Sequence, residues 1–123
     1  MSDDRRQFGQ SSEEAAAELL RQHGYEIVKQ NYRTKTGEID IIAKDGETLV
    51  FVEVKARRSG SFGHPKYAVN YRKQQKISKT ALWYMKTSGQ MHCSARFDVV
   101  SLIASGKNPR IEILKNAFAL ACP

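Results

Sequence analysis

Apolar and polar residues alternate on both sides of an Asp45-Gly46 pair, within residues 37–55. Such alternation is typical of half-buried strands, and Asp-Gly between two alternating runs is a strong short-range hairpin signal. The stretch therefore predicts two antiparallel strands joined by a tight turn, and the rest of the chain is organised around them. The expected apolar face, buried in the core, consists of Ile39, Ile41, Val50, Val52 and Val54.

The other face of this hairpin collects charged side chains. If the loop is centred on Asp45-Gly46 and holds an even number of residues, Asp40 lies opposite Phe51. Asp40 and Glu53 are then diagonal neighbours on one face, roughly 7–8 Å apart. Lys55 points to the same side, because side chains alternate along a strand. Two carboxylates at this spacing can share one small cation, whereas an odd-numbered loop would change the parity and weaken the inference.

The remaining pattern predicts two helices, three further strands and several loops. Residues 1–10 are polar and expected to be frayed, and Ser11 and Glu14 have capping-box spacing at the start of the first helix. The expected elements are a helix from Ser11 to a stop at Gly24, a strand Tyr25 to Arg33, a polar loop Ala56 to His64, a short turn or helix near Lys66 to Val69, a helix Arg72 to Lys86, strands Arg96 to Ile103 and Arg110 to Leu114, and an apolar tail Asn116 to Pro123. This order predicts a mixed sheet flanked by helices.

Both predicted helices are amphipathic. The expected buried stripes are Ala16, Leu19, Leu20 and His23 on the first helix, and Ile77, Ala81, Leu82 and Met85 on the second. Trp83 and Tyr84 are interpreted as core residues, with base stacking as the alternative. Asp98, within a predicted strand, is expected to pair with a basic neighbour rather than to act in catalysis.

A chain of 123 residues predicts one domain spanning residues 1–123. The apolar runs are too short for a membrane span, and the acidic, polar start lacks the shape of a signal peptide. Cys93 and Cys122 form no disulfide framework, which favours a reducing, cytoplasmic setting. His92-Cys93 lacks the further ligands that a zinc site requires.

The net charge of +7 is concentrated in one segment. Eight of the 20 basic residues and none of the 13 acidic residues lie between Lys55 and Lys79, directly after the carboxylate-bearing strands. A charged run is often only a solvated face, but a localised excess favours a polyanion such as nucleic acid. The residues expected to bind nucleic acid are Arg57, Arg58, Lys66, Arg72, Lys73, Lys76 and Lys79.

Several motifs resemble known proteins. Asp40 followed by Glu53-Val54-Lys55 is similar to the D…(D/E)-x-K signature of restriction-endonuclease-like nucleases. Together with the other motifs, it resembles the bacterial YraN-like proteins, uncharacterised protein family (UPF) 0102, over nearly the whole chain. These motifs are Asn31-Tyr32-Arg33, Gly37-Glu38-Ile39-Asp40, Val50 to Arg57, Phe62-Gly63 and Arg96 to Val100. The family is similar to archaeal Holliday-junction resolvases, which implies a three-layer α/β/α fold with a mixed central sheet of about five strands.

The resemblance also implies residue roles. Asp40 and Glu53 match metal-binding carboxylates, and Lys55 matches the lysine that orients or activates the attacking water. Glu13 matches a first-helix glutamate that completes the metal shell, although Ser12-Glu13 stands where the family usually has Gly-Glu. Glu38 and Gln74 match positions with a supporting role near the site. The implied cofactor is Mg²⁺ or Mn²⁺, the preferred partners of carboxylate oxygens, and resolvase-like relatives imply a homodimer.

Two functions of different classes follow from these observations. One is a metal-dependent endonuclease acting on DNA, including branched DNA. The other is a nucleic-acid-binding module that keeps the nuclease fold without cutting. The presence of Asp40, Glu53 and Lys55 together favours the nuclease, because a binding module does not need all three. In the simplest structural interpretation, these residues form only surface ion pairs.

Overall fold

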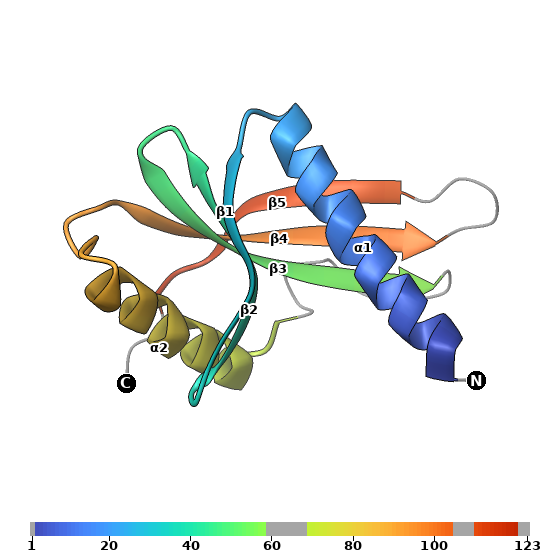
Figure 1. Ribbon diagram of the computed structural model, residues 1–123, viewed down its shortest axis with the longest axis horizontal. Helices are drawn as coiled ribbons and strands as arrows, with labels where there is room; N and C mark the ends of the chain where they lie inside the picture. The colour runs from blue at the N-terminus through green and yellow to red at the C-terminus, as the bar shows by residue number, and fades with distance from the viewer. Residues whose placement is uncertain (1, 59–68, 105–109, 121–123) are drawn as a thin grey trace.

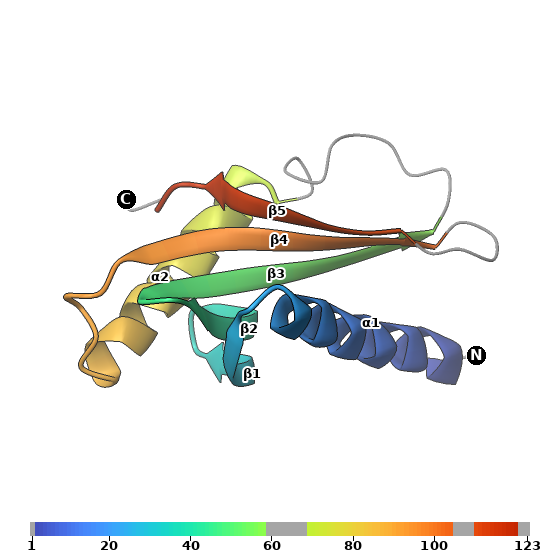
Figure 2. The same cartoon turned by 90° about the horizontal axis from the view of Figure 1, so that it is seen from above.

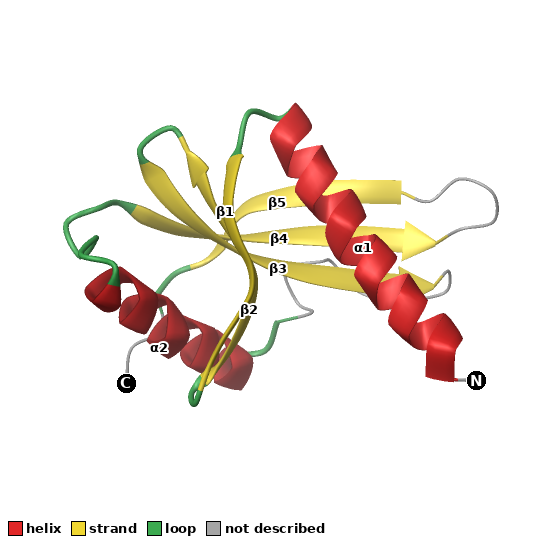
Figure 3. Cartoon of the chain, viewed as in Figure 1, coloured by secondary structure: helices red, strands yellow, loops and turns green. Residues whose placement is uncertain are grey.

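The computed structural model describes residues 2–58, 69–104 and 110–120, which form two helices and five strands (Figure 3). The elements are α1 (Ser2–Gln22), β1 (Glu26–Thr34), β2 (Gly37–Asp45), β3 (Thr48–Arg58), α2 (Tyr71–Thr87), β4 (Ala95–Ala104) and β5 (Arg110–Phe118). The five strands form one sheet in the order β1-β2-β3-β4-β5 (Figure 1). The β3–β4 pair is parallel and the other three pairs are antiparallel, so the predicted mixed α/β sheet is confirmed.

The two helices bury apolar side chains against different sides of the sheet. Ala16, Ala17 and Leu20 of α1 belong to a core cluster that contains Ile41 and Val50. Figure 2 shows α1 running along one side of β3, β4 and β5. This arrangement confirms the predicted sheet flanked by helices.

The second core cluster lies under α2. Ile77, Ala81 and Met85 of α2 pack there with Phe51 of β3 and Phe97 of β4. Because both faces of the sheet are covered, the central strands β3 and β4 carry long apolar stretches. Polar residues in that region therefore stand out against an apolar background.

The β2–β3 turn differs from the predicted turn by one position. Asp45 pairs with Thr48, so the loop is Gly46-Glu47 rather than Asp45-Gly46. Gly46 has φ +65°, a conformation that glycine adopts without steric cost. The observed register pairs Ile41 with Val52, which shifts the predicted pairing by two residues. An even shift leaves the parity of the side chains unchanged.

Several predicted boundaries are wrong. α1 begins at Ser2, so Ser11 lies inside the helix and does not cap it. The first ten residues contain no proline, and one interior glycine costs a helix only about 1 kcal/mol. β3 continues to Arg58, where it pairs with Ala104 of β4, so residues 56–58 are strand rather than loop. The rest of the predicted loop and turn, residues 59–68, lies outside the described residues.

Three predicted faces also need correction. His23 is exposed, at the end of the α1 stripe. Ile39 is buried in the cluster under α2, whereas Ile41 packs in the cluster under α1. On α2, Tyr84 is buried and Leu82 is only half-buried, while Trp83 is 52% exposed. The interpretation as core is therefore confirmed for Tyr84 and wrong for Trp83.

The last strand is longer than the alternation of its sequence predicts. β5 includes residues 116–118 of the expected tail, and Phe118 stacks on Phe97 of β4 with ring centroids 4.8 Å apart. This part of the tail packs on the core of its own chain. Within the described residues, no helix is long and apolar enough to cross a membrane.

Candidate active site

The β2–β3 hairpin brings two carboxylates together. The β2–β3 pairing ends at Ile41–Val52, and Asp40 and Glu53 are the next residue on each strand, where both line one cavity. Asp40 Oδ2 accepts a hydrogen bond of 2.8 Å from the backbone N–H of Val54. The two acids are therefore close together, as predicted, but at positions just beyond the paired part of the hairpin rather than at diagonal positions within it.

These carboxylates border a cavity between the hairpin and the start of α2. The cavity has a volume of about 260 Å³, and its lining comes from β2, β3 and α2. The side chain of Glu53 is only 8% exposed. The lining residues are Gly37, Glu38, Asp40, Glu53, Lys73, Lys76 and Ile77.

Two lysines approach the same oxygen of Glu53. Lys73 Nζ lies 2.6 Å from Glu53 Oε1, and Lys55 Nζ lies 3.7 Å from it. Lys55 comes from the same strand two residues further on, so it shares a face with Glu53. Lys73 is directed there by the first turn of α2, whose N-cap residue Asn70 accepts a hydrogen bond from the Lys73 N–H.

Asp40 is electrostatically the least satisfied carboxyl of the cavity. Burial, and then the neighbouring charge of Glu53, raises the pKa of Asp40 to about 7. Glu13 and Glu38 raise this pKa further, while the hydrogen bond from Val54 opposes the shift. Near neutral pH, Asp40 therefore holds a proton for part of the time, and any cation entering the cavity competes with it.

The two lysines respond to the site in opposite directions. Burial lowers the pKa of Lys55, and the adjacent ammonium of Lys73 lowers it further. Burial also acts to lower the pKa of Lys73, but its close contact with Glu53 raises that pKa above the usual value. Lys73 is therefore a firmly charged partner of Glu53, and Lys55 is the lysine that gives up its proton more readily.

The other residues assigned to the site occupy different positions. Glu13 on α1 is half-buried and acts on Asp40 through its charge, but it does not line the cavity. Among the described residues, no group of three His, Cys, Asp or Glu side chains is arranged to hold a metal. Glu38 lines the cavity and pairs with Arg33 at 3.3 Å. Gln74 donates a 2.8 Å hydrogen bond to the carbonyl of Val69.

The basic residues expected to bind nucleic acid fall into three groups. Lys73 and Lys76 line the carboxylate cavity, so Lys73 is a residue of the site as well as a surface cation. Arg72 and Lys79 are exposed on α2. Arg57 and Arg58 lie at the end of β3, and Lys66 lies outside the described residues. The contact of Lys73 with Glu53 was not predicted; Asn70, a favourable N-cap residue, is the sequence signal that could have located the first turn of α2 and so the position of Lys73.

A second charged cluster lies on the opposite side of the sheet. Asp98 is fully buried and accepts hydrogen bonds from Arg96, from the Tyr25 hydroxyl and from the Asn116 N–H, all between 2.9 and 3.0 Å. Arg96 also donates to Asp45 at 2.9 Å. The expected pairing of Asp98 with a basic neighbour is confirmed, and its burial and full hydrogen bonding mark this cluster as structural.

The fold and the cavity lined by Asp40 and Glu53 define an α/β protein with a mixed sheet and a carboxylate–lysine site at its central hairpin. The profile of the uncharacterised protein family UPF0102 matches residues 12–102. The chain therefore belongs to family UPF0102, as the sequence motifs indicated.

Relatives named as UPF0102 proteins resemble nearly the whole chain. One from Desulfosudis oleivorans is 52% identical over 118 residues, which cover 96% of this chain and 94% of the relative. One from Geobacter metallireducens is 47% identical over 121 residues, or 98% of this chain and 99% of the relative. A third, from Syntrophus aciditrophicus, is 50% identical over 113 residues, or 92% and 89% of the two chains.

Proposed function

We propose that this protein is a Mg²⁺- or Mn²⁺-dependent endonuclease that hydrolyses phosphodiester bonds in DNA, including branched DNA such as four-way junctions. The observation that carries the proposal is the shared cavity of Asp40 and Glu53, with Lys55 on the same face of β3. A site that only paired charges would gain nothing from a carboxyl whose pKa is raised to about 7.

The donor chemistry of the cavity fits a hard divalent cation. Carboxylate oxygens are preferred by Mg²⁺ and Mn²⁺, which use few protein ligands and keep several waters. Asp40 and Glu53 would hold the ion, with Glu13 contributing charge from α1. When bound, the ion would polarise the phosphate and lower the pKa of its water.

The chain's own groups supply the remaining functions. Lys55 would orient the attacking water and take its proton at Nζ, which its lowered pKa favours. Lys76 and Arg72, on the exposed start of α2, would bind phosphates of the DNA. Glu38 would support the cavity wall through its pair with Arg33.

The decisive experiment combines metal binding with cleavage. Mn²⁺ titration and cleavage of a four-way junction are measured for the wild type, Asp40→Asn and Lys55→Ala. Asp40→Asn should lose metal-induced stabilisation and cleavage but keep DNA binding. Lys55→Ala should bind Mn²⁺ normally and cleave about 10²–10⁴-fold more slowly, the usual loss for a general base.

Glu112→Gln serves as the matched control, because Glu112 is a carboxylate on β5 that pairs with Arg110 away from the cavity. It should bind Mn²⁺ and cleave like the wild type. If Asp40→Asn binds Mn²⁺ as the wild type does, the hairpin carboxylates are not the metal site and the nuclease proposal fails.

One observation favours a second candidate, a nucleic-acid-binding module without catalysis. Lys73 Nζ lies 2.6 Å from Glu53 Oε1, where it already neutralises one of the two carboxylates. In that case the cavity would be a permanent ion pair beside a basic surface. Wild-type protein that binds a four-way junction but neither takes up Mn²⁺ nor cleaves would establish this alternative.

The same proposal includes the setting of the protein. A nuclease making two symmetric cuts in a junction would act as a homodimer, which sedimentation with and without junction DNA would detect. The two cysteines fit a reducing, cytoplasmic compartment.

A further inference from the structure

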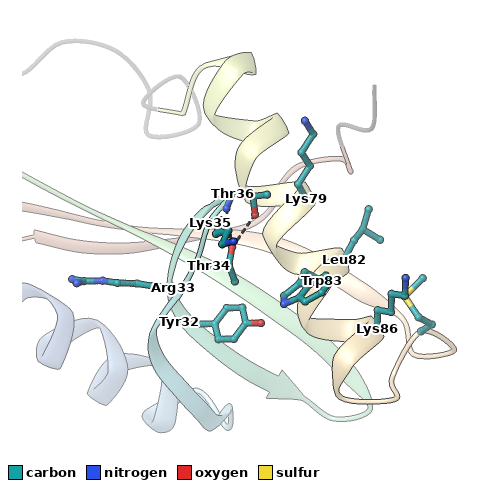
Figure 4. A pocket seen from close by; sticks show the side chains of 10 residues that line it. Tyr32, Arg33, Thr34, Lys35, Thr36, Lys79, Leu82, Trp83 and Lys86 are labelled. Carbon is teal, nitrogen blue, oxygen red and sulfur yellow. Dashed lines mark hydrogen bonds between the residues drawn. The ribbon is translucent and has the colours of Figure 1, made fainter.

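A second and larger cavity lies on the other side of the β1–β2 turn from the carboxylates. It has a volume of about 800 Å³ and is bounded by the end of β1, the turn and the second half of α2 (Figure 4). We call it the β1–α2 groove. Its lining residues are Tyr32, Arg33, Thr34, Lys35, Thr36, Lys79, Leu82, Trp83, Lys86 and Met91.

The apolar part of the groove is aromatic and accessible. Trp83 and Tyr32 project into the same space from opposite sides, one from α2 and the other from β1 (Figure 4). Trp83 is 52% exposed, and Met91, which also lines the groove, is 57% exposed. Tyr32 is held in place by an edge-to-face contact with the buried Tyr84, with ring centroids 5.3 Å apart. The groove therefore offers the exposed ring of Trp83 and the ring of Tyr32, which is fixed by its contact with Tyr84.

The polar part of the groove is positive. Its lining contains four basic residues and no acidic residue. Arg33 extends away from the groove and pairs with Glu38, and Lys35, Lys79 and Lys86 are the other basic lining residues (Figure 4). An accessible aromatic surface in a groove with a basic rim matches a nucleobase attached to phosphates better than it matches an acidic peptide.

The groove and the carboxylate cavity border the same helix and are separated by the β1–β2 turn. Lys73 and Lys76 line the cavity, whereas Lys79 and Trp83 line the groove further along α2. The turn between the two cavities is fixed to α2, because Thr36 Oγ1 lies 2.9 Å from Thr80 Oγ1. From Lys73 to Trp83 the helix rises about 15 Å, a distance that a single strand spans with a few nucleotides.

We propose that the β1–α2 groove binds an unpaired nucleotide of a nucleic-acid strand, with its base stacked on Trp83 and its phosphates contacted by Lys35, Lys79 and Lys86. The proposal rests on the proposed function for one point only, that the strand continues to the Asp40–Glu53 cavity. It adds a preference for DNA with a single-stranded segment several nucleotides from the cut. A base in a duplex is stacked on its neighbours and cannot present its face to Trp83.

The chain carries its own reporter for this contact. Trp83 is the only tryptophan in the sequence, so tryptophan fluorescence, excited selectively over that of the five tyrosines, reports on this groove. Titration of an oligothymidylate into the protein in EDTA should quench the Trp83 emission, and the titration should weaken as salt is added. A duplex of equal charge should quench less. Equal quenching by the duplex, or by polyglutamate, would overturn the proposal.

Substitution separates stacking from general attraction. Trp83→Leu should weaken binding of a labelled oligothymidylate by roughly 5- to 100-fold in fluorescence anisotropy, the range for loss of one base stack. Tyr71→Leu is the matched control, because Tyr71 is an aromatic residue of α2 that is 60% exposed and does not line the groove. An equal loss in both variants, or no loss in Trp83→Leu, would contradict a stacking site at Trp83.

Failure of the groove and failure of the nuclease are distinguishable. The quenching is measured without metal, and Asp40→Asn should leave it unchanged, because Asp40 does not line the groove. If quenching occurs but no substrate is cleaved, the groove belongs to a binding module. If cleavage occurs without preferential quenching by single strands, the groove proposal alone is lost.

Discussion

Asp98 and Asp40 are carboxylates on opposite sides of one sheet, and their surroundings differ in a way that separates structure from function. Asp98 accepts four hydrogen bonds, two of them from the guanidinium of Arg96. Asp40 has one backbone donor and faces another carboxylate, which raises its pKa to about 7. A buried carboxylate that has hydrogen-bond donors and a cationic partner around it stabilises the fold. A buried carboxylate with few donors and a like charge beside it is available to a ligand.

The strongest way to test this comparison is to remove Asp98. Asp98→Ala leaves the Tyr25 hydroxyl, the Asn116 N–H and much of Arg96 without their acceptor inside the protein. Loss of one partner of a buried ion pair costs about 3–5 kcal/mol, so the urea midpoint should fall steeply. A loss below about 1 kcal/mol would show that the Asp98 cluster is not what stabilises this side of the sheet.

Replacement of Asp40 should instead raise the stability of the metal-free protein. In the folded protein the pKa of Asp40 is raised to about 7, whereas the ordinary pKa of an aspartate, which applies to the unfolded chain, is 3.8. Between these values the folded chain binds more protons, so its metal-free stability falls as pH rises, and the penalty is complete above pH 7. Asp40→Asn keeps an acceptor for the Val54 N–H and removes the charge.

Asp40→Asn should therefore stabilise the metal-free protein by roughly 1–3 kcal/mol above pH 7 and leave it nearly unchanged below pH 4. Urea unfolding in EDTA at several pH values measures both effects. Asp98→Asn is the matched variant and should destabilise at pH 8. A destabilised Asp40→Asn at pH 8 would mean that Asp40 is as well satisfied as Asp98.

The smallest expected effect concerns Lys73. Its ammonium must leave Glu53 before a divalent ion can use that carboxylate, so Lys73→Gln should tighten Mn²⁺ binding about tenfold, or about 1.4 kcal/mol. Isothermal titration calorimetry gives the dissociation constants. Lys76→Gln, which removes a charge from the same cavity lining without breaking the Glu53 pair, should change Mn²⁺ binding less. Weaker binding in Lys73→Gln would indicate that Lys73 orders Glu53 for the metal rather than competing with it.

The sequence predicted the fold well because its signals are local. The alternation around Gly46 defines β2 and β3, and a shift of two residues in register kept Ile41, Val50 and Val52 on one face, although Ile39 lies on the other. The prediction that Asp40 and Glu53 meet therefore survived an error in the turn. Helix α1 began earlier than predicted because a capping-box spacing at Ser11 is a weak signal within a segment that can continue a helix.

Features that depend on contacts between distant elements could not be read from the sequence. Lys73 reaches Glu53 only because α2 packs across the hairpin. Trp83 and Tyr84 are adjacent and similar in chemistry, yet the direction of each on α2 makes one exposed and the other buried. The β1–α2 groove likewise exists only after the β1–β2 turn docks on Thr80. Periodicity defines a helix face, but the neighbour that covers it is set by the tertiary fold.

The tight loop between β2 and β3 also has a consequence for how the protein folds. The hydrogen bond from Val54 to Asp40 joins residues 14 positions apart, whereas the bond from Tyr25 to Asp98 joins residues 73 positions apart. Closing a short loop costs less entropy and occurs sooner. We therefore expect the carboxylate pair to assemble when the hairpin forms, and the Asp98 cluster to close only when β4 has joined the sheet. The repulsion between Asp40 and Glu53 is present before the contacts that outweigh it, so cations in the surrounding solution would favour the first step of folding.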